Sequence, residues 1–167
     1  MGAAAASRDL FSQVQTWKRS SGKGESMSVN VMIVDDSLPM RTVIIKTIKA
    51  SGFGNAHFFE AINGREALNL LQTEWMDLVI TDYNMPEMNG MELLQEMKKD
   101  DILRAIPVLV VTTEGSREKI KAFLAQGAAD YVKKPFTPEA IRQKIISLLG
   151  VEDLASGPDD AEAHMDF

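Results

Sequence analysis

Hydrophobic residues follow two different periods along the middle of the chain. Short segments with the character of strands cover residues 29–34, 57–61, 77–82, 107–112 and 129–133, and those at 29–34, 77–82 and 107–112 contain apolar runs rich in β-branched residues, typical of buried strands. Apolar residues at helical spacing follow these segments, over residues 40–51, 65–73, 90–99, 116–126 and 138–149. This alternation predicts an α/β fold, a doubly wound five-stranded parallel sheet with helices on both faces and right-handed crossovers.

The predicted sheet occupies residues 28–150 and leaves no room for a second domain of ordinary size. Residues 1–27 form an extension in which positions 7–19 carry one apolar helical face, followed by a flexible linker. Two interpretations stay open for it: an added segment, since Met27 is itself a candidate start, or a helix that docks on a partner or on the domain. Residues 151–167 carry six acidic and no basic residues and are predicted to be disordered.

Composition and charge exclude several classes of function. The net charge is −6, and most of the negative excess lies in residues 151–167, so no basic face for nucleic acid is indicated. The chain has no cysteine, which rules out disulfides and thiolate metal sites. The apolar runs are too short to span a bilayer, and the N-terminus does not resemble a secretory signal. We therefore expect a cytoplasmic protein without membrane insertion.

Polar residues stand at the ends of four of the predicted strands. Asp35 and Asp36 follow the first strand, Asp82 ends the third, Thr112 ends the fourth and Lys134 follows the fifth. Each of these residues alone has an ordinary explanation, such as a helix cap, a β-former or a solvated lysine. The carboxyl ends of parallel strands meet at one edge of the sheet, where α/β proteins bind ligands. Together, the residues therefore predict a functional site.

Three neighbouring carboxylates and one lysine suit phosphoryl chemistry. The carboxylates repel one another unless a cation neutralises them, and Mg²⁺ is the hard ion preferred where a phosphate supplies further oxygens. Asp82 is then a nucleophile for phosphorus, Lys134 a point charge for phosphate oxygens, and the Thr112 hydroxyl a hydrogen-bond donor to them. Phosphoryl transfer depends mainly on positioning and charge stabilisation, which this set supplies.

The motifs at these strand ends resemble the receiver domain of response regulators, most of all the chemotaxis (CheY-like) type. The matching stretches are Asp35-Asp36, Asp82-Tyr83-Asn84-Met85-Pro86-Glu87-Met88-Asn89-Gly90, Thr112-Thr113-Glu114 and Tyr131-Val132-Lys133-Lys134-Pro135-Phe136. The resemblance covers residues 28–150. It implies a flavodoxin-like strand order 2-1-3-4-5 and a switch of a two-component system that is phosphorylated by a histidine kinase (CheA-like). Such a switch is not an enzyme acting on other substrates.

The resemblance also implies roles for individual residues. Asp82 would be the phosphoacceptor, and Mg²⁺ would be bound by Asp35, Asp36, Asp82 and the backbone carbonyl of Asn84. Lys134 would contact the phosphoryl group, with a cis peptide bond before Pro135. Thr112 and Tyr131 would form the conformational switch, and Asn84 and Glu114 would flank the water that removes a short-lived phosphoryl group. The surface that reports the switch would include Arg117, Ile120, Tyr131 and Lys133.

The expected partners are a histidine kinase and, on the reporting surface, a flagellar motor switch protein or a phosphatase. In one alternative, the protein is phosphorylated in the same way but has no flagellar motor target, and it acts as a phosphate sink or as a shuttle in a phosphorelay. Another is a phosphohydrolase with an aspartyl-phosphate intermediate, of the haloacid-dehalogenase type. That class needs a second Asp two positions after the nucleophile on the first strand, and residues 35–38 lack this spacing. A dinucleotide-binding fold is weaker still, because Gly52-Phe53-Gly54 follows a helix.

Overall fold

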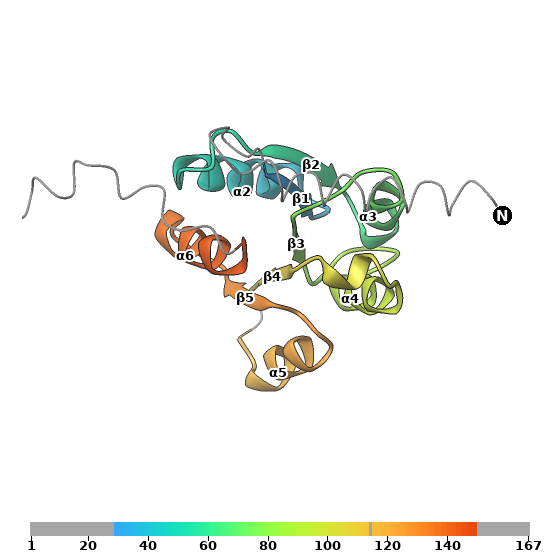
Figure 1. Ribbon diagram of the computed structural model, residues 1–167. Helices are drawn as coiled ribbons and strands as arrows, with labels where there is room; N and C mark the ends of the chain where they lie inside the picture. The colour runs from blue at the N-terminus through green and yellow to red at the C-terminus, as the bar shows by residue number, and fades with distance from the viewer. Residues whose placement is uncertain (1–28, 114, 150–167) are drawn as a thin grey trace, which may run out of the picture.

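The computed structural model describes residues 29–113 and 115–149, in which strands and helices alternate as the sequence predicts (Figure 1). The strands are β1 (Asn30–Val34), β2 (His57–Ala61), β3 (Leu78–Asp82), β4 (Val108–Thr112) and β5 (Asp130–Lys133). The helices are α2 (Leu38–Ala50), α3 (Gly64–Leu71), α4 (Gly90–Lys99), the short 3₁₀ helix η1 (Leu103–Ala105), α5 (Arg117–Ala125) and α6 (Pro138–Leu149).

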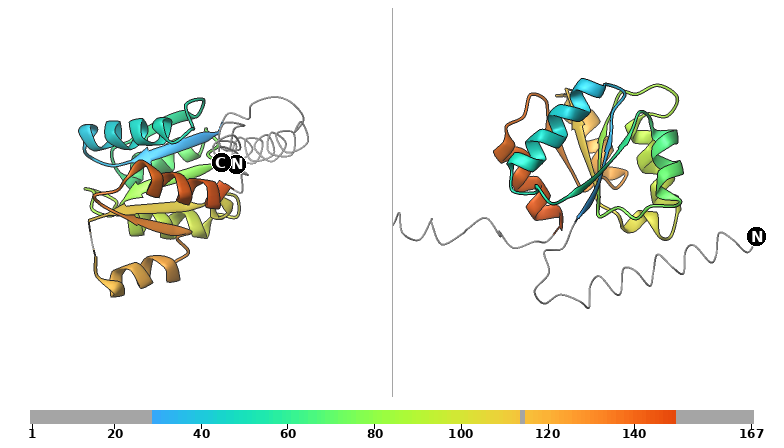
Figure 2. Two further views of the ribbon diagram at one scale, coloured as in Figure 1. Left: turned by 90° about the vertical axis from the view of Figure 1, so that its left-hand side faces the viewer. Right: turned by 90° about the horizontal axis from the view of Figure 1, so that it is seen from above.

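The five strands form one parallel sheet in the order β2-β1-β3-β4-β5, which confirms the predicted fold class and strand order. Helices α2 and α6 cover one face, and α3 and α4 cover the other (Figures 1 and 2). Helix α5 lies beside the β5 edge, apart from the other helices (Figure 1). In the register, Val34 pairs with Thr81 and Asp82 pairs with Val111, so the strands end nearly level at their carboxyl edge.

Alternate residues of the strands build two separate apolar cores. On one face, Val31 and Ile33 of β1 join a cluster with Ile44 of α2 and Ile141 of α6. On the other face, Met32 and Val34 join a cluster with residues of α3, α4 and α5. Because successive side chains of a strand point to opposite faces, the fully apolar strand sequences need a helix layer on each side. This explains why the central strands carry continuous apolar runs.

The helix bounds differ from the sequence-based expectation by up to two residues, and one short helix was not expected. Helix α2 begins at Leu38, two residues before the predicted start, because the Ser37 side chain accepts a hydrogen bond from the Met40 N–H (3.3 Å). The 3₁₀ helix Leu103–Ala105 was not predicted. Its preceding turn is held by Asp100, whose Oδ1 accepts hydrogen bonds from Ile102 N–H (2.8 Å) and from the next amide. A local carboxylate thus makes a short helix that has no apolar period of its own.

The predictions for residues 7–19, for the linker and for residues 151–167 lie outside the described residues, as does Glu114. Within the described ranges, none of the helices has the length and apolar character needed to cross a bilayer. The structure therefore bears on the sheet, its helices and the residues at its carboxyl edge.

Candidate functional site

The carboxyl edge of the sheet brings together the acidic residues predicted from the sequence. Asp35, Asp36 and Asp82 each offer a carboxylate oxygen within 4.8 Å of the others. The ammonium group of Lys134 lies 3.4 Å from Asp35 Oδ2 and 3.5 Å from Asp82 Oδ1. Asp35 is buried, Asp82 is half-buried and Asp36 is exposed. The cluster is therefore anchored on its inner side and open to solvent on its outer side.

Asp35 is held by Ser37 and Arg41, two residues for which no role was expected from the sequence. Its Oδ1 accepts a hydrogen bond from the Ser37 N–H (2.8 Å), and its backbone carbonyl accepts one from Arg41 Nη1 (2.7 Å). Arg41 is itself buried and donates from Nε to Glu60 Oε1 of β2 (2.9 Å). In the sequence, the only indication that Arg41 has a role was its position, as a charged residue, on the face of α2 that points into the protein. The Ser37 bond orients the Asp35 carboxylate, and the Arg41 bond holds the Asp35 backbone.

Asp82 is positioned by the turn that follows β3. Its Oδ1 accepts a hydrogen bond from the Tyr83 N–H (2.9 Å), and the Tyr83 carbonyl accepts one from the Gly90 N–H (2.9 Å). A Cβ atom at Gly90 would collide with the Asp82 carbonyl oxygen and would lie 3.2 Å from Tyr83 Cα. Glycine is needed here because α4 starts directly against the backbone of the strand end.

The charge balance of the site favours a cation. Burial raises the pKa of Asp82, the positive charge of Lys134 opposes this effect, and the neighbouring Asp35 raises the pKa further; the net shift is upward. A single lysine thus leaves the negative charge of the cluster partly uncompensated. Each of the three carboxylates can supply an oxygen, the type of ligand that Mg²⁺ prefers, so the residues present fit this ion.

Thr112 and Lys134 are joined through their backbones. Thr112 ends β4 with its side chain buried, and its carbonyl accepts a hydrogen bond from the Lys134 N–H (2.8 Å). The peptide bond between Lys134 and Pro135 is cis, as the resemblance implied. These contacts place the last residues of β4 and β5 beside the acidic cluster.

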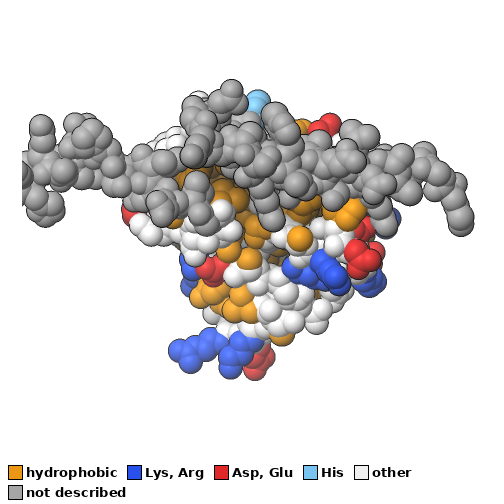
Figure 3. Space-filling view, viewed as in Figure 1, with side chains coloured by type: hydrophobic (Ala, Val, Ile, Leu, Met, Phe, Trp, Pro, Cys, Tyr) orange, Lys and Arg blue, Asp and Glu red, His pale blue; other side chains and the backbone are white. Residues whose placement is uncertain are grey.

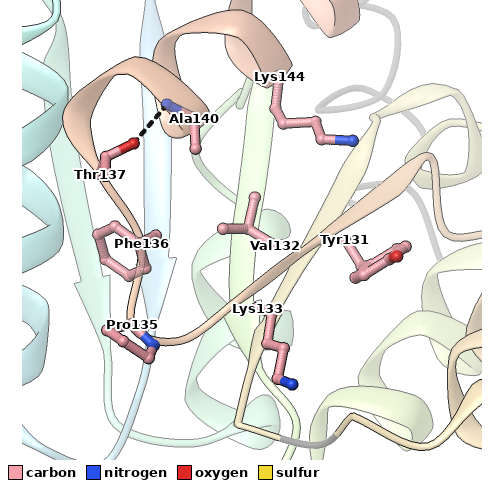
Figure 4. A pocket seen from close by; sticks show the side chains of 8 residues that line it. All are labelled: Tyr131, Val132, Lys133, Pro135, Phe136, Thr137, Ala140 and Lys144. Atoms are coloured by element: carbon pink, nitrogen blue, oxygen red, sulfur yellow. Dashed lines mark hydrogen bonds between the residues drawn. The ribbon is translucent and has the colours of Figure 1, made fainter.

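Two other predicted site residues, Asn84 and Tyr131, are not part of the acidic cluster. Asn84 is exposed in the loop between β3 and α4, directly beyond Asp82 and Tyr83. Tyr131 lies on β5, half-buried, and the ammonium of Lys144 lies 5.8 Å from its ring centre. Its side chain lines a shallow groove between β5 and α6 (Figure 4). The acidic cluster and the predicted reporting residue therefore occupy two distinct places.

A ring contact links the residue after Asp82 to α5. The rings of Tyr83 and Phe123 lie 4.9 Å apart at 78°, an edge-to-face arrangement. Phe123 is the buried residue of α5, and the ammonium of Lys119 lies 5.8 Å from the Tyr83 ring centre. Helix α5 is thus anchored close to the site by an aromatic residue whose role the sequence did not indicate.

Comparisons with known proteins agree with this arrangement. Residues 31–146 match the sequence model of the response regulator receiver domain. Chemotaxis protein CheY1 of Helicobacter pylori is 36% identical over 126 residues, which cover 75% of this chain and 100% of that protein. A chemotaxis protein CheY homolog of Campylobacter jejuni is 37% identical over 123 residues, which cover 73% of this chain and 93% of that protein.

The fold also matches a solved structure. The chemotaxis response regulator CheY4 of Vibrio cholerae matches with a TM-score of 0.67 and 32% sequence identity, over 74% of this chain and 100% of that chain.

Proposed function

This chain belongs to the response regulator receiver family, and we propose that it is a single-domain signalling switch whose Asp82 accepts a phosphoryl group from a histidine kinase. Its receiver domain is of the CheY-like chemotaxis type. The observation that carries the proposal is the meeting of Asp35, Asp36 and Asp82 with the Lys134 ammonium at the carboxyl edge of the sheet. Receiver domains of this family act as signalling switches.

In the proposed reaction, a carboxylate oxygen of Asp82 attacks the phosphorus of a phosphohistidine. An oxygen–phosphorus bond forms, the phosphorus–nitrogen bond breaks, and the imidazole nitrogen keeps the electron pair and takes up a proton. Lys134, already 3.5 Å from Asp82 Oδ1, supplies positive charge to the phosphoryl oxygens. The Tyr83 N–H orients the Asp82 carboxylate throughout, because it donates to Oδ1.

Asp35, Asp36 and Asp82, with the backbone carbonyl of Asn84, would hold Mg²⁺. When bound, the ion supplies positive charge between the carboxylates and the incoming phosphoryl oxygens, which lowers their mutual repulsion. The Ser37 N–H orients the Asp35 carboxylate through its Oδ1, and Arg41 holds the Asp35 backbone through its carbonyl. Donor orientation of this kind is the usual contribution of residues behind the metal ligands.

Phosphorylation would act on the switch through Thr112 and Tyr131. The phosphoryl group on Asp82, at the end of β3, would carry about two negative charges in place of the single charge of the carboxylate, and it would offer new acceptor oxygens beside Thr112 at the end of β4. The Thr112 hydroxyl donates to one of these oxygens, and the space it leaves accommodates the ring of Tyr131. The surface formed by α5, β5 and α6 then changes shape, including Arg117, Ile120, Tyr131 and Lys133. Water flanked by Asn84 and Glu114 would attack the phosphorus, release inorganic phosphate and reset the switch.

We place the protein in the cytoplasm and propose that its target is a flagellar motor switch protein, because the named relatives are chemotaxis proteins. A second candidate, a phosphate sink or phosphorelay shuttle, keeps the same site chemistry. In this account, residues 28–150 are the switch domain and residues 1–27 and 151–167 are additions to it.

The two candidates differ in what the phosphorylated protein binds. The protein is incubated with Mg²⁺ and acetyl phosphate, and its affinity for purified flagellar motor switch protein is compared with that of untreated protein and of Asp82→Asn. A motor regulator binds more tightly after phosphorylation, and the gain is absent in Asp82→Asn. Equal binding in all three samples would reject the motor target and favour the sink or shuttle.

A further inference from the structure

A groove between β5 and α6 lies outside the acidic cluster. It encloses about 340 Å³ and is lined by residues of β5, of the following loop and of the first part of α6, namely Tyr131, Val132, Lys133, Pro135, Phe136, Thr137, Ala140 and Lys144. Figure 4 shows Lys144 and Lys133 on opposite sides of Val132, with Phe136 and Ala140 nearby. The groove thus combines apolar side chains with a positive charge at each end.

The elements around the groove are basic in an otherwise acidic protein. The elements that line the groove, β5 and α6, carry three basic and two acidic side chains, and the adjacent helix α5 adds three basic and one acidic, whereas the whole chain has a net charge of −6. Figure 3 shows Lys and Arg side chains gathered at the lower margin of the molecule, over α5. The Lys133 side chain is exposed beside Gly115. This face therefore fits an acidic, partly apolar peptide.

Such a peptide is present in the same chain. Residues 151–167 contain six acidic and no basic residues, arranged with Leu154 next to Glu152-Asp153 and with Asp159-Asp160 further on. One residue, Gly150, separates them from the end of α6 at Leu149. At 1.5 Å per residue, about 8 Å of helix separates Lys144 from Leu149. Three extended residues span roughly 10 Å, so the first few residues of the segment are long enough to reach Lys144. The remaining residues are long enough to reach Lys133.

We infer that residues 151–167 fold back on the groove between β5 and α6, pairing their acidic side chains with Lys144 and Lys133 and placing Leu154 against Val132 and Phe136. Lys144 already donates to Asp130 Oδ2 (2.8 Å), and an ammonium group has three donors, so it serves a second carboxylate as well. Because the segment is tethered, its local concentration is on the order of millimolar, and weak contacts suffice to keep the groove occupied.

The segment would compete with any partner that uses the α5, β5 and α6 face. This consequence rests on the proposed function, whereas the docking itself needs no phosphoryl group. The test is therefore made on unphosphorylated, full-length protein without Mg²⁺. A negative result then concerns the docking of residues 151–167 alone and not the phosphorylation of Asp82.

The chain has no cysteine, so Ala161→Cys gives one attachment site for a nitroxide label. We expect the label to broaden the NMR signals of the groove amides, Tyr131 to Ala140 and Lys144, more than those of β2 at the far edge. Lys133→Glu should abolish this selective broadening, and so should raising the salt from 0.1 M to 1 M, which shortens the Debye length from about 10 Å to about 3 Å.

The matched control is Lys99→Glu, the same charge change on α4 at an exposed position on the other face of the sheet. It should leave the broadening of the groove amides unchanged. Broadening that depends only on distance from Leu149, or that survives both Lys133→Glu and high salt, would overturn the inference.

Discussion

The ammonium group of Lys134 lies 3.5 Å from Asp82 Oδ1, although the two residues stand at the ends of strands that are not neighbours in the sheet. β4 separates them, and the Thr112 carbonyl on β4 holds the Lys134 backbone in place. The same ammonium lies 3.4 Å from the buried Asp35. One lysine therefore provides the counter-charge for two carboxylates that the fold forces together.

Lys134→Met keeps most of the side-chain volume and removes the charge. We expect the free energy of unfolding to fall by about 1–3 kcal/mol, because Asp35 and Asp82 lose their shared counter-ion in a partly buried place. We also expect the pKa of Asp82 to rise further, since Lys134 is what opposes the effect of burial. Urea unfolding followed by circular dichroism and NMR titration of the Asp82 carboxyl carbon measure the two effects.

Lys133→Met is the matched control, because Lys133 is the adjacent residue and its side chain is exposed. Its stability should stay within about 0.5 kcal/mol of wild type. Equal losses in the two variants would mean that the Lys134 charge has no special role in the site.

Asp82→Asn should raise the melting temperature at neutral pH in the absence of Mg²⁺. Burial raises the folded-state pKa of Asp82 above the ordinary value of 3.8 that holds in the unfolded chain. The ionised carboxylate therefore begins to destabilise the folded protein as the pH rises past the unfolded-state pKa, and does so fully above the folded-state pKa. As the pH falls below the unfolded-state pKa, the carboxyl is neutral in both states and the advantage of the asparagine variant disappears. Thermal unfolding of both proteins from neutral pH down to about pH 3, which lies below the unfolded-state pKa of an aspartate, measures the difference in melting temperature.

Asp101→Asn controls for the change in net charge, because the Asp101 side chain is 86% exposed and far from the cluster in the fold. It should melt like wild type across the same pH range. A variant Asp82→Asn that is less stable than wild type at neutral pH would contradict the charge balance described for the site.

Gly90→Ala should destabilise the protein by about 1–3 kcal/mol, because the new Cβ meets the Asp82 carbonyl and the backbone must move. Gly54→Ala is the control, since nothing lies within 4 Å of a Cβ there, and it should be neutral or gain less than about 1 kcal/mol. Chemical denaturation of both variants decides the point. Similar stabilities would show that α4 can move away from the strand end without cost.

The ring contact between Tyr83 and Phe123 should couple the site to α5. In a double-mutant cycle with Tyr83→Leu and Phe123→Leu, we expect a coupling free energy of about 0.5–1.5 kcal/mol. Hydrogen exchange in α5 should become faster in either single variant, because Phe123 is the buried anchor of that helix. Additive effects and unchanged exchange would mean that α5 is held by other contacts.

Much of this arrangement follows from the sequence because strand ends of a parallel sheet share one edge. Asp35, Asp36 and Asp82 end or follow apolar runs and Lys134 follows the fifth predicted strand, so the meeting of these four residues was predictable. The partners that orient the cluster were not. Arg41 and Glu60 belong to different elements, and nothing in either segment indicates that they meet; the same holds for Tyr83 and Phe123. Local patterns fix the elements, whereas contacts between side chains depend on how the elements pack.

The central claim is that Asp82 is the phosphoacceptor. The most direct measurement incubates wild type, Asp82→Asn and Asp101→Asn with acetyl phosphate and Mg²⁺, followed by intact-mass spectrometry and mapping of the modified peptide. We expect the mass of one added phosphoryl group in wild type and Asp101→Asn, located on the peptide that contains Asp82, and none in Asp82→Asn or when Mg²⁺ is chelated. An adduct that persists in Asp82→Asn, or that maps to another residue, would contradict the account.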